Sequence, residues 1–198
     1  QHYSAADIDM LQAALGLLET HYPADAATPM GENIRAHLMT AALIVADLNI
    51  LADAVAATLL CRLPEYCPTH WQEYVQAACP PHVGPLIEGI DQIQKLTEFA
   101  RVDKMVLPEE RQRQAETMRK MLLAMVSDIR VVLIKLALRT QTMHFIGDVP
   151  DSEARRALAK ETLDIFAPLA NRLGVWQLKW ELEDLGFRYQ EPEAYSRI

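Results

Sequence analysis

Apolar residues recur at helical spacing along most of the chain, and this pattern constrains the fold more than any other feature. Between residues 83 and 99, for example, Leu86, Ile87, Ile90 and Ile93 follow one another at the spacing of a single helix face. No run of alternating apolar and polar residues is long enough to predict a strand. The 198 residues include only 7 Gly, which leaves few positions for hairpin turns. We therefore predict an all-α fold, a compact bundle of about eight to ten helices.

The same spacing, together with proline and short polar residues at the ends, predicts where the helices lie. The predicted helices span residues 7–19, 33–46, 53–63, 71–78, 83–99, 109–125, 128–143, 151–173 and 176–188. We expect Pro64 to end the third helix and Pro168 to kink the long helix 151–173, because proline lacks an amide proton. Ser127 and Asp128 are expected to cap the helix that follows them.

Composition excludes several classes of protein. Hydrophobic residues make up 51% of the chain, which is typical of a folded globular protein. Lys and Arg number 19 against 27 Asp and Glu, a net charge of −8, which disfavours a domain that grips nucleic-acid phosphates. Three cysteines are too few for a disulfide framework. There is neither a signal peptide nor a membrane-spanning run, so we expect a cytoplasmic protein without membrane contact.

Common catalytic motifs for phosphate loops, zinc proteases and serine hydrolases are absent. Two Cys-x-x-His pairs, Cys67 with His70 and Cys79 with His82, offer four potential zinc ligands. A helix over 71–78 places the two pairs at its opposite ends, more than about 12 Å apart at 1.5 Å per residue. We therefore do not expect them to converge on one metal ion.

Several long sequence blocks are similar to a known family. They are Thr-Met-Arg-Lys-Met-Leu-Leu-Ala-Met-Val at 117–126, Asp-Ile-Arg-Val-Val-Leu-Ile-Lys-Leu-Ala at 128–137 and Ala-Pro-Leu-Ala-Asn-Arg-Leu-Gly-Val at 167–175. Together with 176–195 they resemble the N-terminal region of long RelA/SpoT-type (p)ppGpp synthetase/hydrolases, over about residues 31–198. The resemblance implies an all-helical HD-type phosphohydrolase domain that removes the 3′-pyrophosphate of the nucleotide. In that family, Mn²⁺ is held by a histidine, a His-Asp dipeptide and a distant aspartate.

By this resemblance, most of the metal positions are substituted in this chain. His37 stands where the family has its first metal histidine. Cys61 and Arg62 replace the His-Asp dipeptide, and Leu138 replaces the distant aspartate. A guanidinium is a permanent cation and a leucine has no lone pair, so neither binds a divalent ion. We therefore expect Mn²⁺ binding to be lost, with no other cofactor.

The neighbouring polar positions differ as well. Glu65 and Tyr66 stand where the family has a Glu-Asp pair, and Thr142 replaces an asparagine. Only the glutamate of that pair is kept, and we expect Arg62 to pair with it. With these substitutions we expect no catalytic residue, and hence no enzyme activity, in this part of the protein.

The resemblance implies a role within a longer protein, of which the chain from Gln1 to Ile198 is expected to be a piece. We expect a catalytically inactive pseudo-hydrolase domain of a GTP pyrophosphokinase of the stringent response, as in the monofunctional RelA branch. Two alternatives stay open: a divergent HD metal-dependent (p)ppGpp 3′-pyrophosphohydrolase with a rearranged site that uses Cys61 with His37, or a protein-interaction module.

The expected domains are an N-terminal helix and loop (1–30), the HD-type domain (31–173) and a connector helix (174–198). The expected partner is the synthetase domain of the same chain, which transfers pyrophosphate from ATP to GTP or GDP. Trp176 and Trp180, four residues apart on the connector, are suited to packing against it. Ribosome and tRNA contacts are expected only from C-terminal regions absent here.

Overall fold

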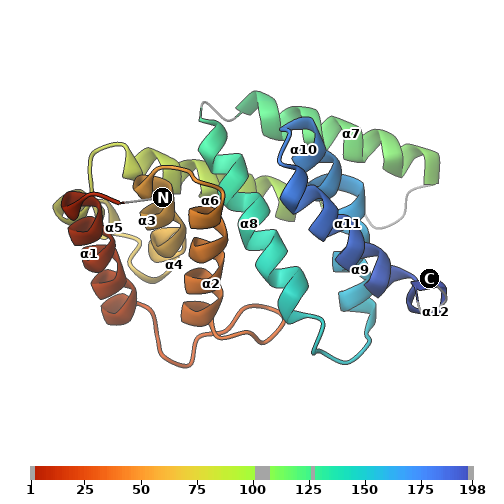
Figure 1. The fold of residues 1–198 in the computed structure, drawn as a ribbon, viewed down its shortest axis with the longest axis horizontal. Helices are drawn as coiled ribbons and strands as arrows, with labels where there is room; N and C mark the ends of the chain where they lie inside the picture. The colour runs from red at the N-terminus through yellow and green to blue at the C-terminus, as the bar shows by residue number, and fades with distance from the viewer. Residues whose placement is uncertain (1–2, 101–107, 126–127, 196–198) are drawn as a thin grey trace. The chain divides into compact units, whose positions relative to one another are not determined.

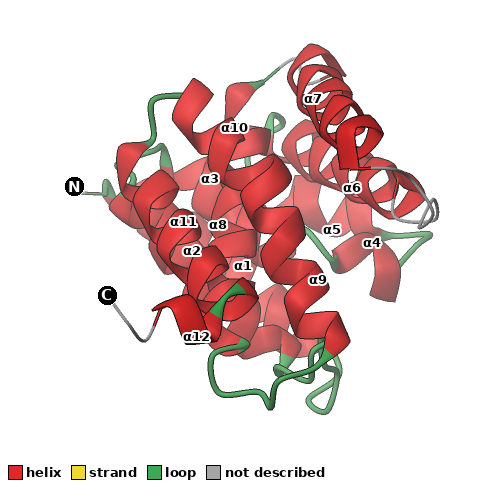
Figure 2. Cartoon of the chain, turned by 90° about the vertical axis from the view of Figure 1, so that its right-hand side faces the viewer, coloured by secondary structure: helices red, strands yellow, loops and turns green. Residues whose placement is uncertain are grey.

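The computed structural model describes residues 3–100, 108–125 and 128–195, and helices dominate these ranges (Figure 1). Within them there is no strand, only an isolated antiparallel bridge between Ala27 and Asn33, so Figure 2 is drawn in helix and loop colours. The predicted all-α fold is confirmed. No helix within the described ranges combines the length and the apolar character needed to cross a membrane.

The helices and one π-helical segment are α1 (Ala5–His21), α2 (Ile34–Asp47), α3 (Ala52–Leu60), α4 (Leu63–Tyr66), α5 (Trp71–Ala78), α6 (Val83–Ala100), α7 (Pro108–Met125), α8 (Ile129–Phe145), α9 (Glu153–Glu161), η1 (Thr162–Phe166), α10 (Ala167–Arg172), α11 (Trp176–Gln190) and α12 (Pro192–Tyr195). The chain divides into two compact units. The first comprises residues 1–102 and 126–135, and the second comprises residues 103–125 and 136–198.

The first unit is built around α3, whose nine residues are all buried. Five of them are alanine or threonine, and these small side chains allow α1, α2 and α6 to pack closely around it. In Figure 1, α3 lies between α1 and α2. The flanking helices begin at side-chain caps: Ser4 and Asp7 form a capping box on α1, and Asn33 caps α2. The cap at Asn33 fixes the start of α2, the helix that carries His37.

Pro64 does not end a helix, contrary to the prediction. The buried helix α3 stops at Leu60, and Pro64 lies in the first turn of the short helix α4. The first helical turn has no intrahelical partner for its amides, so a residue without an amide proton is tolerated there. The chain therefore turns between Cys61 and Arg62, two of the residues singled out by the sequence.

The second unit contains α7, α9, η1, α10 and α11. The helix predicted over 151–173 is divided, since the π-helical turn η1 separates α9 from α10. Pro168 lies in the first turn of α10, and the amide of Ala167 bonds to the carbonyl of Thr162, five residues back. The predicted irregularity near Pro168 thus takes the form of a π-bulge. Gly186 of α11 lies directly against Leu163 of this bulge.

The cap predicted ahead of α8 involves Asp128. Its Oδ1 accepts a hydrogen bond from the Arg130 amide at 2.9 Å, which satisfies one of the first amides of the helix. Ser127, the other predicted capping residue, lies outside the described residues. Asp128 therefore anchors the end of α8 that belongs to the first unit.

Candidate functional site

His37, the predicted metal histidine, is held by a buried carboxylate. It lies in the first turn of α2, just after the Asn33 cap, and is 6% exposed. Its Nδ1 is 2.7 Å from Oε2 of Glu32, which is buried as well. A carboxylate can only accept a hydrogen bond, so Nδ1 donates its proton to Glu32 and this contact fixes the orientation of the imidazole. Histidines that bind a metal or face a substrate are held in this way.

Cys61 follows the last residue of α3 and is 5% exposed. Burial raises the pKa of its thiol to about 12, although the neighbouring Arg62 guanidinium acts in the opposite direction. At neutral pH the side chain is therefore a neutral thiol. Since the thiolate is the form that binds metals and attacks electrophiles, Cys61 is a poor ligand in this position.

Arg62 and Glu65 form the ion pair that the sequence predicts, between Arg62 Nε and Glu65 Oε1. Both side chains are partly exposed, with 32% and 42% of their surface accessible. The pair spans three residues at the start of α4. It places a guanidinium where the resemblance expects an aspartate and leaves the glutamate at its expected position.

Tyr66 contributes an aromatic ring to this region. Its ring centroid is 4.9 Å from that of Tyr22, whose hydroxyl donates to the Leu59 carbonyl at 3.2 Å. Burial raises the pKa of both tyrosines, so both are neutral phenols at physiological pH. Tyr66 therefore has a packing role and does not supply the carboxylate that the resemblance expects.

The two remaining predicted positions belong to the second unit and lie one turn apart on α8. Leu138 is buried, and the hydroxyl of Thr142 donates to its backbone carbonyl at 3.0 Å. Arg139, between them, is also buried; it bonds to Glu161 at 2.8 Å and its guanidinium lies 4.1 Å from the Phe166 ring centroid. Leu138 offers no ligand atom, and Thr142 uses its hydroxyl within its own helix.

The two Cys-x-x-His pairs have separate partners. Cys67 Sγ lies 3.4 Å from Nδ1 of His21, whereas His82 Nε2 lies 2.8 Å from Oδ2 of Asp53. Across residues 3–100, 108–125 and 128–195, no three His, Cys, Asp or Glu residues come together as a metal-binding group.

Sequence reasoning missed a cluster of charges around Asp53. This carboxylate is 5% exposed and pairs with His82 at the start of α6 and with Arg130 in the first turn of α8. Arg130 pairs in turn with Asp128. The only sequence signal is an aspartate in the otherwise apolar helix α3. The cluster ties the first turns of three helices together.

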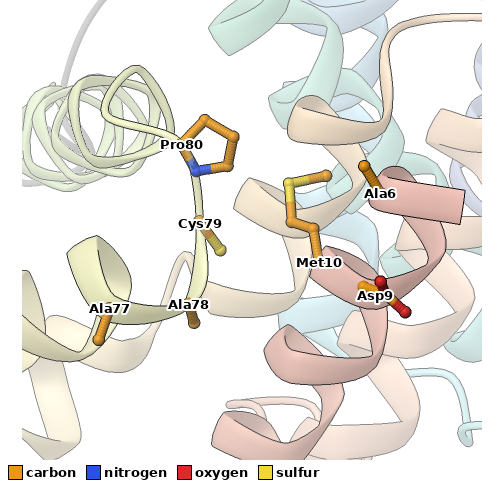
Figure 3. A pocket seen from close by; sticks show the side chains of 7 residues that line it. All are labelled: Ala6, Asp9, Met10, Ala77, Ala78, Cys79 and Pro80. Atoms are coloured by element: carbon orange, nitrogen blue, oxygen red, sulfur yellow. The ribbon is translucent and has the colours of Figure 1, made fainter. Parts of the chain in front are cut away.

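A shallow pocket of about 410 Å³ lies between α1 and the end of α5 (Figure 3). Its lining residues are Ala6, Asp9, Met10, Ala77, Ala78, Cys79 and Pro80. Most of these side chains are small or apolar, and Asp9 is the only carboxylate among them. The lining includes none of the residues that the sequence singled out for the hydrolase site.

Comparison with known proteins identifies close relatives of the chain. The family pattern described as "HD domain" matches residues 14–176. A probable guanosine-3′,5′-bis(diphosphate) 3′-pyrophosphohydrolase from Synechocystis is 38% identical over 168 residues, which cover 85% of this chain and 21% of that protein. The bifunctional (p)ppGpp synthase/hydrolase SpoT of Escherichia coli is 39% identical over 169 residues, 85% of this chain and 22% of that protein. A GTP pyrophosphokinase from Photobacterium angustum is 40% identical over 159 residues, which cover 78% of this chain and 20% of that protein.

These relatives contradict two predictions made from the substituted positions. The chain was predicted to lack enzyme activity and to have lost its metal. However, relatives that align with 85% of it are named as a pyrophosphohydrolase and as a synthase/hydrolase, and the chain itself matches the HD-domain pattern. The description as a pseudoenzyme is not supported either. The predictions rested on residue identity at fixed positions, which does not exclude donors elsewhere in the domain.

The residues at the family's metal positions nevertheless do not fit a divalent ion. Cys61 is a buried neutral thiol, Arg62 carries a positive charge and Leu138 has no lone pair. Of the predicted donors, His37 is an imidazole held by a carboxylate, an arrangement common among metal-binding histidines. We therefore assign no catalytic step to a metal at these positions.

The match over residues 14–176 and the homology to RelA/SpoT-type (p)ppGpp hydrolases and synthetases agree with the all-helical fold. The chain belongs to the HD-domain family.

Proposed function

We propose that this chain is the hydrolase domain of a longer stringent-response protein and that it removes the 3′-pyrophosphate of guanosine 3′,5′-bis(diphosphate). The observation that carries the proposal is the 38–39% identity, over 85% of the chain, to proteins named for this reaction. The chain spans about a fifth of the length of these relatives. The activity is therefore proposed for this domain as one part of a larger protein.

The proposed site is rearranged relative to the family and is centred on the first unit. Glu32 orients the imidazole of His37 through Nδ1, and in this proposal Nε2 is the nitrogen that faces the nucleotide. Arg62 supplies a guanidinium, which binds phosphate oxygens in a bidentate manner and stabilises the charge of a departing pyrophosphate. Glu65, its partner, is a partly exposed carboxylate suited to accepting a proton from water. These roles use groups that the chain retains.

The test is incubation of the chain with ppGpp, with and without added Mn²⁺, followed by anion-exchange separation of the products. We expect GDP and pyrophosphate in equal amounts. His37→Ala is expected to lower the rate at least about 100-fold, as does loss of a general acid or base. His70→Ala changes a histidine whose side chain is 59% exposed and serves as the matched control. Absence of GDP under every condition, from a chain that retains its helical circular dichroism, overturns the proposal.

The second unit supports an additional role toward a synthetase domain. A relative that is 40% identical is named GTP pyrophosphokinase. Trp176 and Trp180 on α11 are 57% and 63% exposed, large apolar surfaces that suit a domain contact. We propose residues 31–173 as the HD domain and residues 174–198 as the connector to this partner.

Replacing both tryptophans with alanine in the full-length protein tests this role. We expect the rate of pyrophosphate transfer from ATP to GTP to change, while ppGpp hydrolysis by the isolated chain stays the same. An unchanged transfer rate counts against the contact.

A further inference from the structure

The three cysteines lie in different environments. Cys61 and Cys79 are buried, and burial raises the pKa of their thiols to about 12 and about 11. Cys67 is only partly buried. Since thiol reactivity requires both access and deprotonation, Cys67 is the cysteine that a reagent in solution reaches first.

A histidine lies beside the Cys67 sulfur. His21, in the last turn of α1, places Nδ1 3.4 Å from Sγ. At this distance the thiol donates to the imidazole, or the thiolate accepts from it, and the two arrangements differ only by a proton transfer.

Tyr74 of α5 holds the imidazole in place. The two rings are stacked, with centroids 4.4 Å apart and planes inclined by 23°. The backbone of Cys67 is fixed as well. Its amide donates to the Leu63 carbonyl at 2.9 Å, and its own carbonyl accepts from the Trp71 amide at 3.0 Å. Sulfur and imidazole are thus aligned by α1, α4 and α5 of one compact unit.

We propose that Cys67 and His21 form a thiol-modification site for low-molecular-weight disulfides. This inference does not depend on the proposed hydrolase function. His21 accepts the thiol proton as the Cys67 sulfur attacks one sulfur of the disulfide. A new S–S bond forms, the S–S bond of the reagent breaks, and its electron pair leaves on the second sulfur, which takes the proton from His21. Cys67 is oxidised to a mixed disulfide and the other half of the reagent is reduced to a free thiol.

The experiment uses the native chain with glutathione disulfide, followed by blocking of the remaining thiols and peptide mass spectrometry. We expect an adduct on Cys67 to form at least about tenfold faster than on Cys61 or Cys79. Equal rates at the three cysteines refute the proposal without any variant.

A pair of histidine variants tests the assignment of the base. His21→Gln is expected to slow the Cys67 reaction at least about tenfold. His70→Gln, which changes a neighbouring histidine whose ring centroid lies 6.3 Å from that of Tyr74, is expected to leave it unchanged. Labelling of Cys61 in the same sample reports whether the variant is folded. An unchanged Cys67 rate in folded His21→Gln also overturns the proposal.

Discussion

Replacing Asp53 with asparagine tests whether the buried charge cluster holds the first unit together. The substitution keeps the shape of the side chain but removes the negative charge that Arg130 and His82 share. The amide group of asparagine also brings a donor toward the donors of the guanidinium. We expect the variant to fold and to unfold more easily.

The stability lost in Asp53→Asn depends on which partners and how much solvent remain for Arg130 and His82. Removing one partner of a fully buried pair costs about 3–5 kcal/mol, since the other charge is left unpaired. Here Arg130 keeps Asp128 and is 21% exposed, and the His82 side chain is 54% exposed. Solvent and the remaining carboxylate reduce the loss to about 2 kcal/mol. For a chain of this size, that corresponds to a fall in melting temperature of about 4–8 °C.

The assay is thermal unfolding followed by circular dichroism at 222 nm. Asp91→Asn is the matched control, because Asp91 pairs with Lys95 one turn away in α6 and the two side chains are 32% and 72% exposed. We expect the control to melt with the wild type. If Asp53→Asn also melts with the wild type, the cluster does not stabilise this unit and the reasoning is wrong.

Three further predictions concern single residues. Tyr22→Phe leaves the buried Leu59 carbonyl without its hydroxyl donor and should lower the free energy of unfolding in urea by about 1 kcal/mol. An unchanged free energy of unfolding would indicate that water satisfies this carbonyl instead. Gly186→Ala places a Cβ 2.7 Å from Leu163 and should destabilise by about 1–3 kcal/mol; an unchanged melting curve would show that Leu163 moves freely. Because the folded state raises the pKa of Cys61 to about 12, this thiol stabilises the fold below its unfolded pKa, and that stability is lost as the pH rises toward 12. Iodoacetamide at pH 9 should therefore label Cys61 quickly only after unfolding, and fast labelling of the native chain would contradict the burial.

Much of the fold follows from the sequence because buried positions repeat with the helical period. The ladder in α6 and the apolar composition of α3 predict both helices, and α5 begins and ends at the predicted residues, Trp71 and Ala78. Here local propensity and tertiary packing favour the same structure. Pro64 is different, because a proline ends a helix or begins one depending on neighbours that periodicity does not describe.

The sequence predicts individual residues of the candidate site, but it predicts few of the contacts between them. The sequence singles out His37 and predicts the Arg62–Glu65 pair, since the latter is separated by only three positions. It does not show that Glu32 holds the imidazole or that Asp53 and Arg130 meet. Asp53 and Arg130 lie 77 residues apart, so their contact depends on packing, and the contact of Glu32 with His37 depends on the conformation of the residues just before α2. The loss of ligands at fixed positions also led to a wrong conclusion about activity.

The most direct test of the account is the release of pyrophosphate from ppGpp labelled in its 3′-diphosphate. The wild-type chain and His37→Ala are compared at the same concentration, each with a melting curve to confirm folding. The account predicts labelled pyrophosphate from the wild type and at most about one hundredth of that rate from the variant. Equal release by the two proteins, or none from the wild type, contradicts the central claim that this HD domain acts on the nucleotide through His37.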